Sequence, residues 1–116
     1  MKKVEFTKEL KADWVAALKS GNFKKGIGQL REKTPDQENK YCCLGVLACV
    51  CPRMEITTGG YGVHLDGGIY DEGYKIFEQM FGIEKVKDLY QTNDNTSAAD
   101  AFASVIPIIE DLPTVD

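Results

Sequence analysis

The sequence has no apolar segment long enough to cross a lipid bilayer. Its longest unbroken apolar run is Tyr41–Cys51, eleven residues, whereas a membrane-spanning helix needs about 20. A membrane partner is therefore not expected. The first residues, Met1–Phe6, are basic but are not followed by an apolar stretch, so no secretory signal is predicted. We expect a cytoplasmic protein with reduced thiols.

Histidine is scarce as well, and the cysteines are confined to one short segment. His64 is the only histidine, and the 4 cysteines all lie within Cys42–Cys51. A disulfide scaffold spaces its cysteines along the chain, and most structural zinc sites use C-x2-C pairs, neither of which is present. Zinc coordination by the thiols with His64 is the weaker alternative. We interpret the cysteines as small apolar residues of a packed segment and predict no metal and no cofactor.

Common enzyme motifs are also absent. There is no G-x4-G-K-[ST] phosphate loop, and Gly26 and Gly28 lack the third glycine of a dinucleotide site, since position 31 is arginine. A cysteine nucleophile would need a base within hydrogen-bond reach, and His64 lies in a different predicted element. We therefore predict a non-enzymatic protein, with a small enzyme acting on a nucleotide or thiol substrate as the alternative.

What the sequence does contain is an uneven distribution of charge. The net charge is −4, yet residues 1–58 carry 11 Lys and Arg against 7 Asp and Glu, and residues 59–116 carry 3 against 11. Either the protein has two faces of opposite charge, or its two halves attract each other across the fold. The net negative charge argues against direct binding of duplex DNA.

The length of 116 residues and the apolar fraction of 43% predict one domain over residues 1–116. The residue pattern predicts an α+β fold with three to four helices and a short antiparallel β-hairpin. The predicted elements are a helix over 7–19 capped by Thr7, a strand over 28–32, a turn over 32–40, a β-hairpin over 54–65 around Gly59-Gly60, and a helix over 72–81 capped by Asp71.

Three segments are less regular. Residues 41–51 fit either a strand or a buried helix, and residues 83–92 fit both types as well. The capping-box pattern Ser97–Asp100 predicts a last helix that continues through Ile109. Pro107 is expected to kink or split that helix, because proline removes one backbone hydrogen bond.

The Lys24–Gly28 segment is the strongest candidate for ligand binding. Two cations beside flexible glycines can bring ammonium and backbone N–H groups together around a phosphate; the alternative is a solvated loop in which the glycines make a bend. The arginines are the expected bidentate partners of such an anion, and tyrosines are the expected aromatic wall. The predicted ligand-binding residues are Lys24, Lys25, Arg31, Arg53, Tyr41 and Tyr61.

Several segments together resemble a family of small bacteriophage proteins with the pattern W-x3-L-x-S-G-x-Y, G-x-L and Y-C-C-L-G-V-L. The matching segments are Trp14–Leu18, Ser20–Phe23, Gly28–Leu30 and Tyr41–Leu47, with Phe23 in place of the usual tyrosine. The resemblance implies a phage accessory protein in the host bacterial cytoplasm and transfers no catalytic residue. From the residues themselves, we expect Trp14 to pack with Tyr41–Leu47, and Gly45 to allow a close approach between the two elements.

These features predict a binding protein that helps a phage by neutralising a host antiviral-defence component. Two mechanisms remain open. The acidic residues of 59–116 could occupy the nucleic-acid channel of a host defence protein. Alternatively, a pocket with Lys24, Lys25, Arg31 and a tyrosine could sequester a nucleotide-derived messenger. A homo-oligomer of the protein could form such a pocket. A structural or regulatory phage module is a further class of function.

Overall fold

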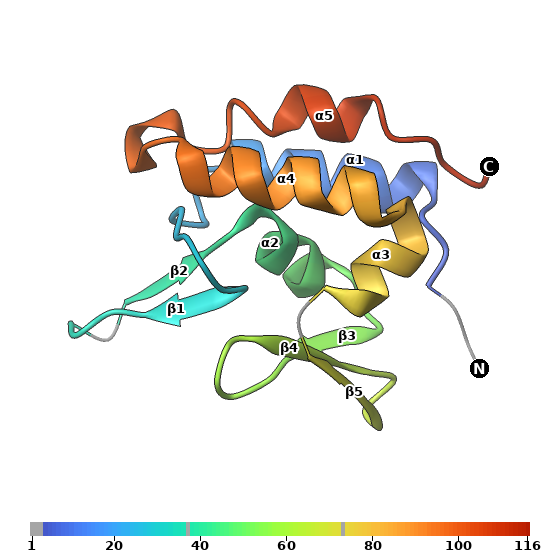
Figure 1. Ribbon diagram of the computed structural model, residues 1–116, viewed down its shortest axis with the longest axis horizontal. Coiled ribbons are helices and arrows are strands. Elements are labelled where there is room, and N and C mark those ends of the chain that lie inside the picture. The colour runs from blue at the N-terminus through green and yellow to red at the C-terminus, as the bar shows by residue number, and fades with distance from the viewer. Residues whose placement is uncertain (1–3, 37, 73) are drawn as a thin grey trace.

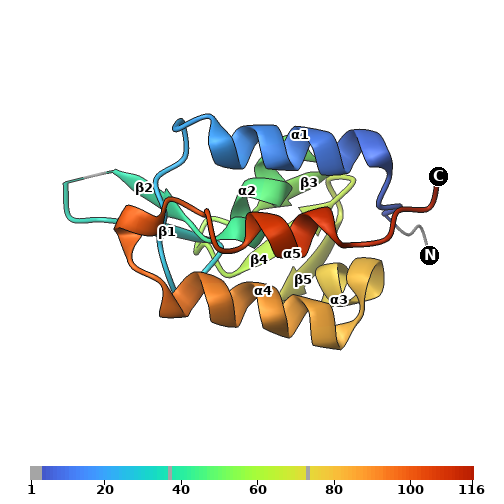
Figure 2. The ribbon, with the colours of Figure 1, turned by 90° about the horizontal axis from the view of Figure 1, so that it is seen from above.

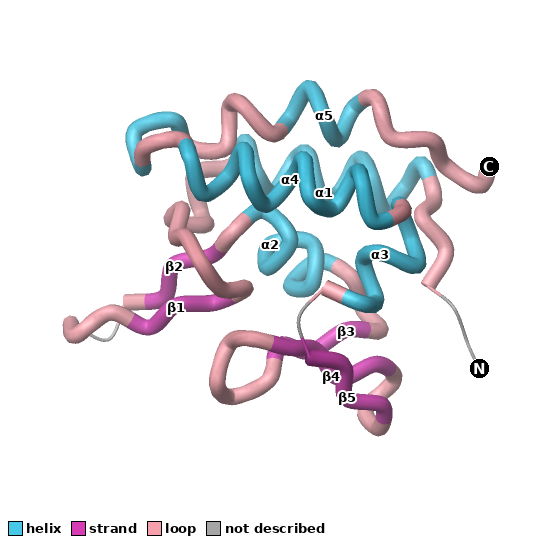
Figure 3. Tube along the Cα trace, viewed as in Figure 1, coloured by secondary structure: helices cyan, strands magenta, loops and turns pink. Residues whose placement is uncertain are grey.

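Helices and strands occupy opposite sides of the protein (Figures 1 and 3). The computed structural model describes residues 4–36, 38–72 and 74–116. These residues form the α-helices α1 (Lys8–Lys19), α2 (Cys43–Val50), α3 (Lys75–Phe81), α4 (Ile83–Asn95) and α5 (Ile106–Glu110). They also form two antiparallel sheets, one of β1 (Arg31–Lys33) and β2 (Asn39–Tyr41), and one of β3 (Met54–Ile56), β4 (Gly62–Leu65) and β5 (Ile69–Glu72). The predicted α+β class is confirmed.

Helix α2 lies at the centre of the fold. Seen from above, α1 and α4 run along the two sides with α5 between them (Figure 2), and α2 packs against both α1 and α4. Residues Cys43–Ala48 are all buried, because this short helix is apolar on every side. The helical alternative for residues 41–51 is therefore correct. Among the described residues, none of the helices has the length and apolarity that a membrane span requires.

Helix α1 follows its sequence prediction closely. The hydroxyl of Thr7 accepts a hydrogen bond from the backbone N–H of Leu10 at 3.1 Å, and the helix ends just before Gly21, whose φ is +79°. Trp14 is fully buried, and its indole N–H donates to the carbonyl oxygen of Cys43 at 2.8 Å. This bond satisfies the one polar group of the Trp14 ring and joins α1 to the first turn of α2.

Gly45 does allow a close approach, but its partner is not α1. A Cβ atom at Gly45 would lie 1.9 Å from the carbonyl oxygen of Leu30. The same carbonyl accepts a hydrogen bond from the backbone N–H of Cys42 at 3.3 Å. The G-x-L and Y-C-C-L-G segments of the sequence therefore pack directly on each other, and Trp14 adds the third contact at Cys43.

The β-hairpin around the two glycines is confirmed, and a third strand extends it. The backbone N–H of Thr57 donates to the carbonyl oxygen of Gly62 across the turn at 2.9 Å. Strand β5 then pairs with β4, so Asp71 lies within a strand and does not begin a helix. Helix α3 begins at Lys75 instead. Residue 73, within the predicted helix over 72–81, lies outside the described residues.

The segment that fitted both structure types, residues 83–92, is helical. It belongs to α4, which begins after Gly82, and the φ of +90° at Gly82 also ends α3. The buried side chains Val86, Leu89 and Asn93 recur at helical spacing on the side of α4 that faces α2. Two of the three are apolar, which leaves Asn93 as a polar residue in the core.

The predicted long C-terminal helix is wrong. Residues 98–100 form a single 3-10 turn, after which Ala101 and Phe102 have φ values of +48° and +69°. An α-helix does not allow these values. Phe102 is nevertheless buried, so the apolar periodicity that suggested a helix reports core contacts made by an irregular segment.

The polar residues of this segment also differ from the prediction. Asp100 does not reach back to Ser97 as in a capping box; its carboxylate accepts from the backbone N–H of Ser104 at 3.0 Å and from the Ser104 hydroxyl at 2.8 Å. These bonds lower the pKa of the Asp100 carboxyl. Pro107 lies in the first turn of α5, where a missing N–H leaves no helical bond unmade, so it neither kinks nor splits a helix.

Charges of the two halves of the chain meet within the fold. Lys25 lies 3.8 Å from Asp100, and Arg53 lies 2.8 Å from Asp66, so each pair joins residues 1–58 to residues 59–116. Lys11 also donates to the carbonyl oxygen of Leu112 at 2.8 Å. These contacts favour the interpretation that the two halves attract each other across the fold.

Candidate anion-binding site

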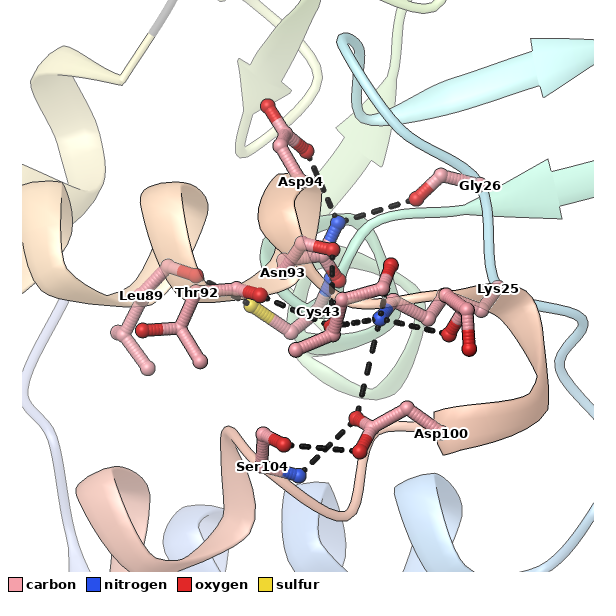
Figure 4. A network of polar contacts seen from close by, with 11 residues as sticks. Lys25, Gly26, Cys43, Leu89, Thr92, Asn93, Asp94, Asp100 and Ser104 are labelled. Carbon is pink, nitrogen blue, oxygen red and sulfur yellow. Dashed lines mark hydrogen bonds and ion pairs between the residues drawn. The ribbon is translucent and has the colours of Figure 1, made fainter.

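Lys25 is directed into the protein rather than toward a ligand. It is 7% exposed, and its ammonium group lies near the end of α4 and Asp100 (Figure 4). The ammonium donates to the carbonyl oxygens of Thr96 at 3.1 Å and Ser97 at 3.2 Å, and to the Thr96 hydroxyl. An ammonium group has three donors, so these bonds use all of them. Lys25 therefore closes the C-terminal end of α4, where a cation is favoured.

The other groups of the Lys24–Gly28 loop are committed to the chain as well. Lys24 forms an ion pair with Glu38. The backbone N–H of Gly26 donates to the carbonyl oxygen of Tyr41 at 2.7 Å, and that of Gly28 donates to the carboxylate of Asp94 at 3.3 Å. These contacts give the loop's groups partners within the chain, so the structure does not support the predicted convergence of the loop on a phosphate.

The neighbouring lysines allow a matched test of this assignment. We expect Lys25→Met to lower the free energy of unfolding by about 2 kcal/mol, because it leaves the part-buried carbonyl oxygens of Thr96 and Ser97 without this donor. Lys24→Met should leave stability unchanged within error, since Lys24 is exposed. Urea denaturation followed by Trp14 fluorescence measures both variants. Equal losses for the two variants would contradict the structural role of Lys25.

The remaining predicted ligand-binding residues lie at separate places. Two nitrogens of the Arg53 guanidinium, Nε and Nη2, donate to the carboxylate of Asp66 at 2.9 and 2.8 Å. Tyr61, beside the diglycine turn, is 56% exposed. Tyr41 is half-buried and its ring makes an edge contact with that of Phe23, with centroids 5.2 Å apart. The β1–β2 register places Tyr41 opposite Arg31, but the six predicted residues do not line one pocket.

Arg31 does line a polar hollow, which lies between the two β-hairpins and which we call the inter-hairpin pocket. Its volume is about 550 Å³, and it is lined by Gln29, Arg31, Lys33, Asn39, Thr58 and Gly59. Side chains two residues apart on a strand project from the same face, and the register places Asn39 opposite Lys33. Strands β1 and β2 therefore present Arg31, Lys33 and Asn39 on one face, and the β3–β4 turn closes the hollow.

A close backbone contact holds the two hairpins together at the inter-hairpin pocket. The backbone N–H of Arg31 donates to the carbonyl oxygen of Gly60 at 3.1 Å. Gly60 has a φ of +83°, and a Cβ atom there would lie 2.0 Å from the Arg31 carbonyl oxygen, so only glycine fits. The Arg31 guanidinium donates to the carbonyl oxygen of Thr57 at 2.9 Å. This bond orients the guanidinium, and its other N–H groups have no acceptor among the described residues.

The charge of the inter-hairpin pocket differs from that of neighbouring hollows. Among the described residues, no carboxylate lines it, whereas each of four other surface hollows includes at least one aspartate or glutamate. The positive charges of Arg31 and Lys33 are therefore not offset by the pocket's own lining. Such an arrangement favours an anionic ligand, and the planar guanidinium suits a phosphate or carboxylate group.

Three of the four cysteines, Cys42, Cys43 and Cys51, are core residues as interpreted from the sequence, whereas Cys49 is exposed. Burial raises the pKa of Cys42 to about 12 and holds the pKa of Cys43 well above its ordinary value. The sulfur of Cys42 accepts a hydrogen bond from the backbone N–H of Gly45 at 3.4 Å, at the start of α2. Within residues 4–36, 38–72 and 74–116, no group of three or more His, Cys, Asp or Glu side chains could hold a metal ion.

Comparison with known proteins concerns the first half of the chain. A family model described as a domain of unknown function (DUF8296) matches residues 6–58. No curated protein and no solved structure matches the chain. The matched segment extends from the residues before α1 to the diglycine turn, and it contains every residue that lines the inter-hairpin pocket except Gly59.

Sequence reasoning missed most of the pocket, although a signal for it was present. The predicted strand over 28–32 and turn over 32–40 placed Lys33 and Asn39 in a loop, but both belong to strands. With the strand boundary moved by one residue, alternation places Lys33 on the same face as Arg31. Gln29 precedes the strand, and only the folded structure brings it to the second hairpin.

Proposed function

We propose that this protein is a non-enzymatic phage accessory protein that binds a phosphate-bearing, nucleotide-derived ligand in the inter-hairpin pocket and so neutralises a host antiviral-defence component. The observation that carries the proposal is the charge of the pocket. Arg31 and Lys33 share one face of the β1–β2 hairpin, and no described carboxylate lies in the lining. A phosphate in the pocket would accept charge-assisted hydrogen bonds from a guanidinium that Thr57 already orients.

The size of the pocket supports a small ligand. Its volume of about 550 Å³ lies within the range of about 300–1,000 Å³ that is usual for small-molecule sites. A protein that binds a phosphate-bearing messenger lowers the free concentration of that messenger, and hence the signal available to the host. This mechanism requires binding without turnover. Burial raises the pKa of the Cys42 and Cys43 thiols, which makes these two cysteines poor nucleophiles.

The phage setting is supported by the sequence resemblance. The segments that carry it pack on one another through Trp14, Leu30 and Gly45, and strand β1 begins directly after Leu30. The resemblance therefore involves the part of the fold that positions the pocket. The alternative mechanism is an acidic face that mimics nucleic acid. Two of the 11 acidic residues of 59–116, Asp66 and Asp100, are paired with cations of the same chain and are less available for such a face.

Loss of the Arg31 guanidinium tests the proposal. We expect Arg31→Gln to weaken binding of 5′-nucleoside monophosphates at least about tenfold, because a charged hydrogen bond contributes roughly 1.5–3 kcal/mol. The matched control is Arg53→Gln, which removes the chain's other arginine from a site paired with Asp66 and should leave the affinity unchanged. Isothermal titration calorimetry at low ionic strength measures the affinity of the wild type and of both variants for the nucleotide.

The same variants test the biological part of the proposal. In a host that carries the relevant defence system, the wild-type protein and Arg53→Gln should raise phage plating efficiency, and Arg31→Gln should not. Protection that persists in Arg31→Gln would contradict a role for the pocket and favour the acidic-face mechanism. Native mass spectrometry of protein purified from the host identifies any ligand that stays bound.

A further inference from the structure

Gln29 holds the inter-hairpin pocket together through one end of its side chain. Its amide nitrogen donates to the carbonyl oxygen of Arg31 at 2.6 Å and to that of Gly59 at 3.3 Å. One acceptor belongs to the first hairpin and the other to the turn of the second hairpin. Because both neighbours are carbonyl oxygens, the orientation of the amide is fixed: the nitrogen must face them and the oxygen must face elsewhere.

The amide oxygen of Gln29 is therefore the group that this side chain can offer to a ligand. Within the described part of the chain, it receives no hydrogen bond, although Gln29 lines the pocket. The charged groups of the pocket, Arg31 and Lys33, are donors only. The pocket thus combines two cationic donors with one oriented acceptor.

Resting on the proposed function, we propose that Gln29 determines the specificity of the pocket by accepting a hydrogen bond from an N–H or O–H group of the phosphate-bearing ligand. A site that bonds a polar hydrogen discriminates against an analogue that lacks it, because the half-buried acceptor of Gln29 then gives up contact with water and gains no hydrogen bond from the ligand. The ligand class is therefore a phosphate ester with a neighbouring donor. That donor comes either from a nucleobase or from a sugar hydroxyl, and a bare phosphate ester should bind more weakly.

The first test uses NMR chemical-shift titration of the wild-type protein with three probes. Methyl phosphate carries no donor as a dianion, ribose 5-phosphate adds sugar hydroxyls, and 5′-nucleoside monophosphates add the base. We expect the donor-bearing ligands to bind about fivefold to tenfold more tightly than methyl phosphate, as one additional neutral hydrogen bond implies. The side-chain amide signals of Gln29 should shift with the donor-bearing ligands and not with methyl phosphate. A comparison of the affinities for ribose 5-phosphate and for the nucleotides shows whether the donor is a sugar hydroxyl or belongs to the nucleobase.

The second test is the variant Gln29→Met, which keeps the length of the side chain and removes both its acceptor and the donors to Arg31 and Gly59. Loss of the donors weakens binding of both ligands to the same extent, whereas loss of the acceptor weakens only the donor-bearing ligand, so the ratio of the two affinities should fall to about one. If Gln29 has a purely structural role, the substitution weakens binding of both ligands equally and leaves the ratio of their affinities unchanged, which would overturn the inference. Unchanged affinities for both ligands would overturn it as well. If the wild-type protein binds none of the probes, both the proposed function and the inference about Gln29 fail. If binding depends on Arg31 but the ratio does not depend on Gln29, this inference alone fails.

Discussion

Gly45→Ala is expected to destabilise the protein by about 3 kcal/mol or more, because the added methyl group has no space. Its carbon would lie 1.9 Å from the carbonyl oxygen of Leu30 and 2.8 Å from the Leu30 carbonyl carbon. Those atoms belong to backbone that is also fixed by the hydrogen bond from Cys42. Neither α2 nor the segment before β1 can therefore move without losing core contacts.

The sign of this effect separates packing from helix propensity. Gly45 lies inside α2, where propensity alone would make alanine more favourable than glycine by about 1 kcal/mol. The control is Gly68→Ala, since a Cβ atom at Gly68 meets nothing within 4 Å, and its stability should stay close to that of the wild type. Guanidinium denaturation followed by Trp14 fluorescence gives both values. A Gly45→Ala protein as stable as the wild type would show that α2 and Leu30 are not in close contact.

The contact at Gly45 also shows what the sequence could predict about the fold. Helix α1 and the β3–β4 hairpin depend on local signals, namely the Thr7 cap and the Gly59-Gly60 turn, and both were predicted. The glycine was correctly expected to permit a close approach. Its partner Leu30 could not be named, because that contact joins segments that are distant in sequence and carries no periodic pattern.

The prediction failed where an apolar pattern fitted more than one backbone. Phe102, Val105 and Ile109 have helical spacing and are all buried, yet the chain reaches Phe102 through a turn with positive φ. Burial alone therefore does not distinguish a helix from an irregular segment that packs on the same core. Lys25 shows the corresponding limit for predicting the role of a charged residue. Its three acceptor atoms belong to Thr96 and Ser97, which follow α4, and only the folded chain brings them to the ammonium group.

Asn93 is the second position where a single substitution should have a large effect. It is fully buried, and its side-chain oxygen accepts from the backbone N–H of Cys43 at 3.1 Å. Its nitrogen donates to the carbonyl oxygen of Gly26 at 3.0 Å and to the carboxylate of Asp94 at 3.1 Å (Figure 4). One amide thus connects α4, the start of α2 and the Lys24–Gly28 loop, and it satisfies backbone groups in the core.

Asn93→Asp is expected to cost at least about 3 kcal/mol at neutral pH, because it buries a charge and removes the donor to Gly26. Burial and the neighbouring Asp94 would raise the pKa of the new carboxyl in the folded state above its unfolded value of about 3.9. When protonated, this carboxyl can still accept from Cys43 and donate to Gly26. A group with a raised folded pKa contributes its stability below the unfolded pKa and loses it as pH rises through the folded pKa. The deficit relative to the wild type should therefore be smallest near pH 4 and grow toward pH 7.

The control for this pH dependence is Asn93→Leu, which removes the same hydrogen bonds without adding a titratable group. We expect it to be destabilised by about 2–4 kcal/mol, because the Cys43 N–H and the Gly26 carbonyl are both left unpaired. Its deficit relative to the wild type should not change between pH 4 and pH 7. Urea denaturation of the three proteins across this range measures the difference. Parallel pH profiles for Asn93→Asp and Asn93→Leu would mean that the carboxyl reaches solvent, and hence that α4 does not bury Asn93 against α2.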